Sequence, residues 1–288
     1  MMSNIRTKQI IIISAVVLLI AFLFTRDIKG LVKPKEQTTN VPAGGQLTTP
    51  AAAEISLSEV STEGKNVINA NLAKEITSLE NDFKTATGNE QQELAKTLAQ
   101  KWDDVEQPVP SALYLEVVAG QQKTLQSWLA AGGKFMKAYD NTKDSLLQPK
   151  LLQKANTAYT AAMAVDSSSL EAKTGLGITV VDGMGAPMQG IAMLLDVVKR
   201  DPKNTKANMS LGIFAIKSGQ FDKAIVRFED IVAVEPSPDA YFYLATSYEN
   251  LGKNKEAIAA YLNSKKLAAN PTLSKFIDKK VSELKEKI

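Results

Sequence analysis

The order of apolar and polar residues changes twice along the chain. Residues 10–25 are almost continuously apolar, residues 26–54 show no apolar period, and from residue 55 onward apolar residues recur at helical spacing. The strict alternation that indicates a half-buried strand does not occur in this last part of the sequence. The pattern predicts an all-α protein with a single N-terminal transmembrane helix, a flexible linker and a helical body.

The apolar segment 10–25 is flanked by Lys8 and Arg26. As a helix it reaches about 24 Å, somewhat short of the ~30 Å of a hydrocarbon core, and long basic side chains at both ends can cover the difference. No small-residue cleavage site follows Phe24, which favours an uncleaved anchor over a signal peptide. We therefore expect a short tail at residues 1–9 and a transmembrane anchor at 10–25.

The segment 26–54 contains several prolines and glycines and, from Gln37 to Ala53, no charge. This composition is typical of a flexible tether. The excess of Lys and Arg after the apolar segment favours a cytoplasmic body, whereas large domains behind a short N-terminal tail often cross the membrane regardless of nearby charge. We expect a single-pass protein of the cell inner membrane with its folded part in the periplasm, and the cytoplasmic orientation is the alternative.

Composition narrows the chemistry that the chain can perform. Without Cys or His it has no disulfide framework, thiolate nucleophile, Ser-His-Asp triad or histidine metal site. The first 53 residues hold six basic and two acidic residues, which leaves 28 basic and 29 acidic residues in the rest. A body so close to neutral argues against nucleic-acid binding. Neither Gly175-x-Gly177 nor Gly183-x-Gly185 completes a nucleotide-binding motif, so we expect no enzyme, no cofactor and no metal.

A longer period underlies the helical spacing of the body. A Leu-Gly or Leu-Ala pair is followed by a Gly, an Ala, an aromatic residue and a Pro, most clearly in residues 205–236 and 238–271. This order resembles the tetratricopeptide repeat (TPR), whose pattern is W-x2-L-G-x2-Y, then A-x3-F, then P. The resemblance implies a solenoid of helix-turn-helix units. It implies repeats at about 125–167, 170–203, 205–236 and 238–271.

The ends of the array depart from this pattern. Residues 55–124 are expected to form N-terminal helices that include a degenerate repeat, with Pro108 and Pro110 starting its second helix. The unit at 125–167 is longer than the family's, and its extra residues lie within Tyr139–Gln148. Residues 272–288 are rich in Lys and predict the polar capping helix that repeat arrays need.

Each recurring position has a physical role in packing. Small residues let the two helices of a unit approach closely, aromatic residues fill the space between them, a Gly ends the first helix, and the Pro closes the second. The residues expected in these roles are Gly177, Gly190, Leu211, Gly212, Ala224, Phe228, Pro236, Tyr248, Ala257 and Tyr261.

The resemblance also implies a concave groove, because fixed positions of the first helices line it in the family. In this sequence most of them are apolar, and the Met residues suit adaptable binding of a helix or peptide. The predicted protein-binding groove consists of Leu129, Met136, Ile178, Val181, Met209, Ile213, Ile216, Lys217 and Phe242. Ile213 and Ile216 are expected to have no partner inside their repeat. The alternative is that neighbouring repeats or the N-terminal helices cover these residues.

These features predict a membrane-anchored, non-catalytic TPR scaffold that binds a protein or peptide. The architecture is similar to that of bacterial envelope TPR proteins with one N-terminal anchor, which implies a role as an envelope assembly or translocation accessory factor. The alternative is a structural TPR protein that assembles with copies of itself into a homo-oligomer.

Overall fold

The structure, a computed structural model, describes residues 55–288. The tail, the anchor and the linker predicted within residues 1–54 lie outside the described part. Residues 55–288 form thirteen α-helices and no strand, which confirms the all-helical solenoid for this part of the chain. Among these helices none is both long enough and apolar enough to cross a membrane.

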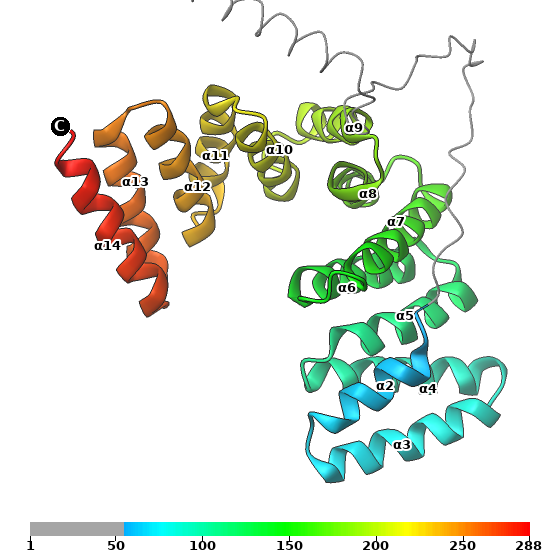
Figure 1. Cartoon of the computed structure of the whole chain (residues 1–288). Helices are drawn as coiled ribbons and strands as arrows, with labels where there is room; N and C mark the ends of the chain where they lie inside the picture. The colour runs from blue at the N-terminus through cyan, green and yellow to red at the C-terminus, as the bar shows by residue number, and fades with distance from the viewer. Residues whose placement is uncertain (1–54) are drawn as a thin grey trace, which may run out of the picture. The chain divides into compact units, whose positions relative to one another are not determined.

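From α3 onward each helix packs mainly on its neighbours in the sequence, whereas α2 packs more on α5 than on α3 (Figure 1). Short turns join them, so pairs of helices form hairpins that stack one after another. The bounds of the helices are α2 Leu57–Asn66, α3 Ala70–Thr85, α4 Gly88–Asp104, α5 Pro108–Gln122, α6 Leu125–Asn141, α7 Gln148–Val165, α8 Leu170–Gly183, α9 Pro187–Arg200, α10 Thr205–Lys217, α11 Phe221–Val234, α12 Pro238–Asn250, α13 Asn254–Leu267 and α14 Pro271–Lys285.

The N-terminal helices α2 to α5 share a core around Trp102 and a buried carboxylate. Glu80 of α3 is 7% exposed and accepts hydrogen bonds from Ser61 at 2.6 Å and from Lys65 at 2.7 Å. The hydroxyl of Tyr114 on α5 donates to the same carboxylate at 3.2 Å. A buried charge is tolerable only when it is paired and hydrogen-bonded, so this cluster fixes α2 and α3 against α5.

Close approach of the two helices in a repeat depends on glycine. A Cβ added at Gly212 of α10 would lie 2.6 Å from the ring of Phe228 on α11. A Cβ at Gly190 of α9 would lie 2.6 Å from the carbonyl oxygen of Gly177 on α8, so these two backbones touch directly. Real Cβ atoms do not come this near to other heavy atoms, and any larger residue would push the helices apart.

The other predicted packing residues lie mostly in the core of α10 to α14. Ala224, Phe228, Ala257 and Tyr261 are each at most 1% exposed, and Leu211 is 7% exposed. Pro236 lies in the turn between α11 and α12, where a second helix ends. Tyr248 packs against the same core, and its hydroxyl also donates to Glu229 of the preceding repeat at 2.6 Å, so this residue joins two repeats as well.

The turns are set by local sequence. Gly219 and Gly252 follow α10 and α12 with φ of 73° and 70°, the left-handed conformation that favours glycine and ends a helix. The first helices begin with polar caps, because the side chains of Ser169, Asn204 and Ser237 each accept a hydrogen bond from the backbone three residues later.

Two boundaries differ from the sequence-based expectation. Helix α6 continues through Asn141, so residues 139–141 of the predicted insertion are helical and only 142–147 connect α6 to α7. The predicted terminal helix begins at Pro271, where a proline is well placed in the first turn. Its residues Ile277, Val281 and Leu284 are buried in the core that it shares with α10 to α13.

Candidate protein-binding groove

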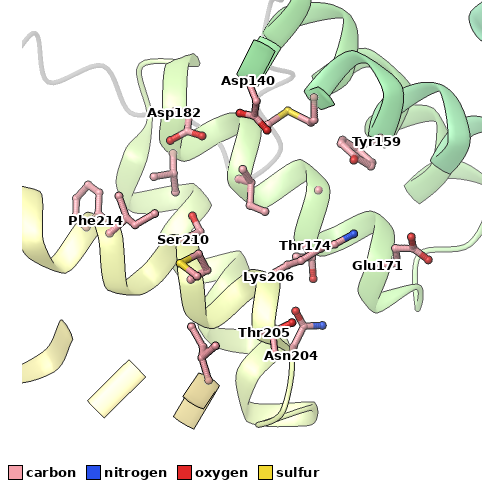
Figure 2. Close-up of a pocket in the computed structure, with 18 of the residues that line it drawn as sticks. Asp140, Tyr159, Glu171, Thr174, Asp182, Asn204, Thr205, Lys206, Ser210 and Phe214 are labelled. Atoms are coloured by element: carbon pink, nitrogen blue, oxygen red, sulfur yellow. The ribbon is translucent and has the colours of Figure 1, made fainter. Parts of the chain in front are cut away.

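The first helices of three successive hairpins, α6, α8 and α10, line one open groove of about 1310 Å³. Figure 2 shows side chains from these helices converging on it, with Asp140 and Asp182 near one end and Thr205 and Asn204 near the other. Pockets for small molecules usually measure about 300–1,000 Å³. The groove therefore has room for a polypeptide segment.

Seven of the nine predicted groove residues line this space, and they come from all three helices. These residues are Leu129, Met136, Ile178, Val181, Met209, Ile213 and Lys217. Leu129 is buried at 8% exposure and belongs to the floor, and the other apolar members are half-buried. The structure thus brings together residues as far apart in the sequence as Leu129 and Lys217, and it leaves part of the half-buried apolar side chains open to the groove.

Ile216 and Phe242 do not line the groove, which corrects the expectation for both. Ile216 packs against the core shared by α11 to α14. Phe242 is enclosed by aromatic rings, with ring centroids 5.7 Å from Tyr261 and 5.9 Å from Phe276 of α14. Helix α14 therefore covers Phe242, so this side chain is not open to the groove.

Ile213 also packs against the core of α10 to α14 while lining the groove. The expectation that Ile213 and Ile216 lack partners inside the chain is therefore wrong for both residues. A charge at either position would disturb the fold as well as the groove, because each side chain contributes to the core. Some side chains that line the groove therefore also belong to the core of the solenoid.

Tyr159 is a groove residue that the repeat pattern did not reveal. It comes from the second helix α7 and is 8% exposed. Its ring lies against Gly132 of α6 and Gly175 of α8, where an added Cβ would lie 2.9 Å and 2.3 Å from ring carbons. The signal in the sequence was the set of glycines inside two helices, because a helical glycine often marks the close approach of a large group.

The charges around the groove are mixed. The acidic groups include Asp140 and Asp182 in the last turns of α6 and α8, and the basic groups include Lys206 and Lys217 of α10. Asp140 and Asp182 keep contact with solvent, but the groove walls desolvate them enough to raise the pKa of each carboxyl. The charge of Asp182 raises the pKa of Asp140 further, whereas that of Lys217 lowers the pKa of Asp182.

The polar groups of the groove include carboxylates, lysines and a threonine hydroxyl. Within residues 55–288, no three His, Cys, Asp or Glu side chains gather closely enough to hold a metal ion. Thr174 lines the groove, but its hydroxyl donates to the backbone of its own helix at 2.7 Å, so no base activates it. The arrangement can bind a partner through apolar area and charge.

Comparison with known proteins supports the fold. Residues 215–271 match the family described as Tetratricopeptide repeat. The solved structure described as "PilW, widely conserved type IV pilus biogenesis factor" aligns with a TM-score of 0.52 at 18% identity, covering 69% of this chain and 93% of that one. The solenoid thus has the TPR fold. A search of curated proteins finds no match.

Two further solved structures resemble the chain less closely. A MamA protein aligns with a TM-score of 0.46 at 18% identity and covers 62% of this chain and 92% of its own. YrrB, described as "a TPR protein with an unusual peptide-binding site", aligns with a TM-score of 0.44 at 14% identity and covers 65% of this chain and 91% of its own.

Proposed function

We propose that the protein is a membrane-anchored, non-catalytic scaffold whose groove between α6, α8 and α10 binds a segment of another protein. The observation that carries this proposal is the groove itself, because one continuous hollow of about 1310 Å³ runs over three repeats with an apolar floor. Large apolar surfaces rimmed by polar residues usually mark interaction sites.

The apolar lining supports a polypeptide as the ligand. Met136 and Met209 offer flexible, polarisable surface that adapts to different side chains, and Ile178 and Val181 offer branched side chains between them. An amphipathic helix or an extended peptide can bury its apolar side chains here, while the charged residues at the edges set its register.

The N-terminal residues are the basis for the proposed location of the protein in the cell. An apolar segment at 10–25, followed by a linker that carries no charge from Gln37 to Ala53, would hold the solenoid near the cell inner membrane, on the periplasmic side. A tethered scaffold of this kind suits an accessory factor in envelope assembly or translocation. This role rests on architecture alone.

Site-specific photo-crosslinking in cells tests the proposed function. A photoreactive amino acid at Met209 in the groove is compared with one at Val226, which is 53% exposed on α11 and outside the groove. We expect a discrete cross-linked protein from position 209 and none from position 226. Adducts with the mass of two copies of this chain would favour the self-assembling alternative. Equal adducts from both positions, or none from either, would refute a groove-binding scaffold.

A further inference from the structure

Two groove carboxylates occupy positions where negative charge is unfavourable. Asp140 is the second-last residue of α6, and Asp182 is the second-last residue of α8. The last turn of a helix carries the negative end of its dipole, so an acidic side chain there is destabilising. Within residues 55–288 neither carboxylate forms an ion pair or a hydrogen bond. Local stability therefore does not account for this pair.

Tyr159 presents a further polar group at the same end of the groove. Its ring is held between Gly132 and Gly175, and its hydroxyl points toward Gly133, where an added Cβ would lie 4.0 Å from the oxygen. Gly133 itself lines the groove. Tyr159 as a whole is 8% exposed, and within the described part of the chain its hydroxyl forms no hydrogen bond, but the oxygen keeps access to solvent. The hydroxyl therefore opens into the groove, where it can bond a ligand.

The surroundings of that hydroxyl are negative. Burial raises the pKa of Tyr159 to about 12, with smaller contributions from the charges of Glu171 and Asp140. The hydroxyl therefore stays protonated at neutral pH and can both accept and donate a hydrogen bond. Figure 2 shows Asp140 above Tyr159 and Glu171 below it, with Asp182 beyond Asp140. A group that enters here meets Asp140 on one side, Glu171 on the other with the nitrogen of Lys206 directed toward it, and the hydroxyl oxygen of Tyr159.

We propose that the groove, if it binds a protein segment as inferred above, selects one carrying a Lys or Arg side chain, which lies against Tyr159 and Asp140 between Glu171 and Asp182. The cation would donate hydrogen bonds to the Tyr159 oxygen and to the carboxylates, and these charge-assisted bonds are the stronger kind. Its aliphatic stem would lie along Leu129 and the other apolar residues of the floor.

Two lysines that line the groove do not occupy the cation site. Lys137 has its ammonium 3.3 Å from Asp103, outside the groove. Lys217 influences Asp182 through its charge, but no ion pair joins them. A third lysine, Lys206, extends toward Glu171 in Figure 2 without forming an ion pair within residues 55–288. An acidic ligand would still have to place its charge beside Asp140 and Asp182, so charge complementarity at this end favours a basic one.

Peptide selection on the full-length protein tests this inference. A library of random 12-residue peptides is selected for binding, with counter-selection against a protein that carries Ser210→Phe, which fills the groove from a residue outside the apolar core. We expect the groove-dependent peptides to be enriched in Lys or Arg at one position. A selected peptide with that residue changed to norleucine, which keeps the stem and removes the charge, should bind at least about tenfold more weakly.

Variants of the protein identify the cation site. The double variant Asp140→Asn with Asp182→Asn should bind the basic peptide and its norleucine analogue with equal affinity. Tyr159→Phe, which keeps the ring between the glycines, should weaken binding by about three- to tenfold. The control Asp230→Asn changes one exposed carboxylate on α11, outside the groove, and should have no effect.

The outcomes separate this inference from the proposed function. Groove-dependent peptides without a basic residue, or binding unchanged in the Asp140→Asn and Asp182→Asn variant, would overturn the cation site and leave the groove as a binding surface. Absence of any peptide that distinguishes Ser210→Phe from the natural protein would overturn both. If Tyr159→Phe binds the basic peptide as tightly as the natural protein does, the hydroxyl is not part of the cation site.

Discussion

Two buried tyrosines allow a matched test of how hydroxyl pairing determines stability. Tyr261 on α13 is 1% exposed, and its hydroxyl donates to the carboxylate of Glu249 at 2.7 Å. Tyr159 on α7 is 8% exposed, and its hydroxyl has no hydrogen-bond partner within residues 55–288 but keeps access to solvent. Replacing either residue with Phe removes one oxygen and leaves the packed ring in place, so the comparison isolates what that oxygen contacts.

The expected free energies differ in size. A hydrogen bond to a charged group contributes about 1.5–3 kcal/mol, so Tyr261→Phe should lower stability by roughly 2 kcal/mol. Glu249 keeps its contact with Lys280 at 2.9 Å, which limits the loss. The Tyr159 hydroxyl has no protein partner and reaches the solvent of the groove, so Tyr159→Phe should change stability by no more than about 0.5 kcal/mol.

Native-state hydrogen exchange, read by mass spectrometry on peptides from each helix, measures both effects locally. This assay suits a repeat array, in which neighbouring units can open separately. Every 1.4 kcal/mol is a factor of about ten, so amides of α12 to α14 should exchange about 30-fold faster in Tyr261→Phe. Amides of α6 to α8 should exchange at nearly the same rate in Tyr159→Phe. Equal acceleration in both variants would refute the reasoning from hydroxyl pairing.

Three further predictions concern packing, pH and the anchor. Gly212→Ala should destabilise the protein by about 1–3 kcal/mol in urea unfolding, whereas Gly120→Ala, on an exposed helix face with nothing within 4 Å, should stabilise it by about 0.5 kcal/mol or more. Burial raises the pKa of Glu249, but contacts including the Lys280 hydrogen bond lower it by more, so the net pKa is below normal. The stability of α12 to α14 should therefore be lost as pH falls through that native pKa, and Lys280→Met should flatten this dependence in pH-resolved hydrogen exchange. The full-length protein should stay with membranes through an alkaline carbonate wash, and deletion of 10–25 should release it; release of the intact protein would contradict the anchor.

Local patterns predicted the repeats well because each recurring position has a short-range cause. Gly212 lies opposite Phe228 since a close helix pair needs a small residue facing a large one. Gly219 takes the left-handed conformation since few other residues can end a helix that way without strain. The spacing of such positions along a helix is independent of the rest of the fold, so these positions can be predicted from the sequence.

The sequence by itself determined the all-helical class, the repeat period and the face of each first helix that turns toward the groove. Only the tertiary structure decided which of those positions stay open. Ile216 and Phe242 occupy the same face as Met209, yet the core and helix α14 cover them. Tyr159 reaches the groove from a second helix, through a gap that glycines on two other helices create. Helical periodicity assigns a residue to a face, but coverage depends on neighbours that lie far away in the sequence.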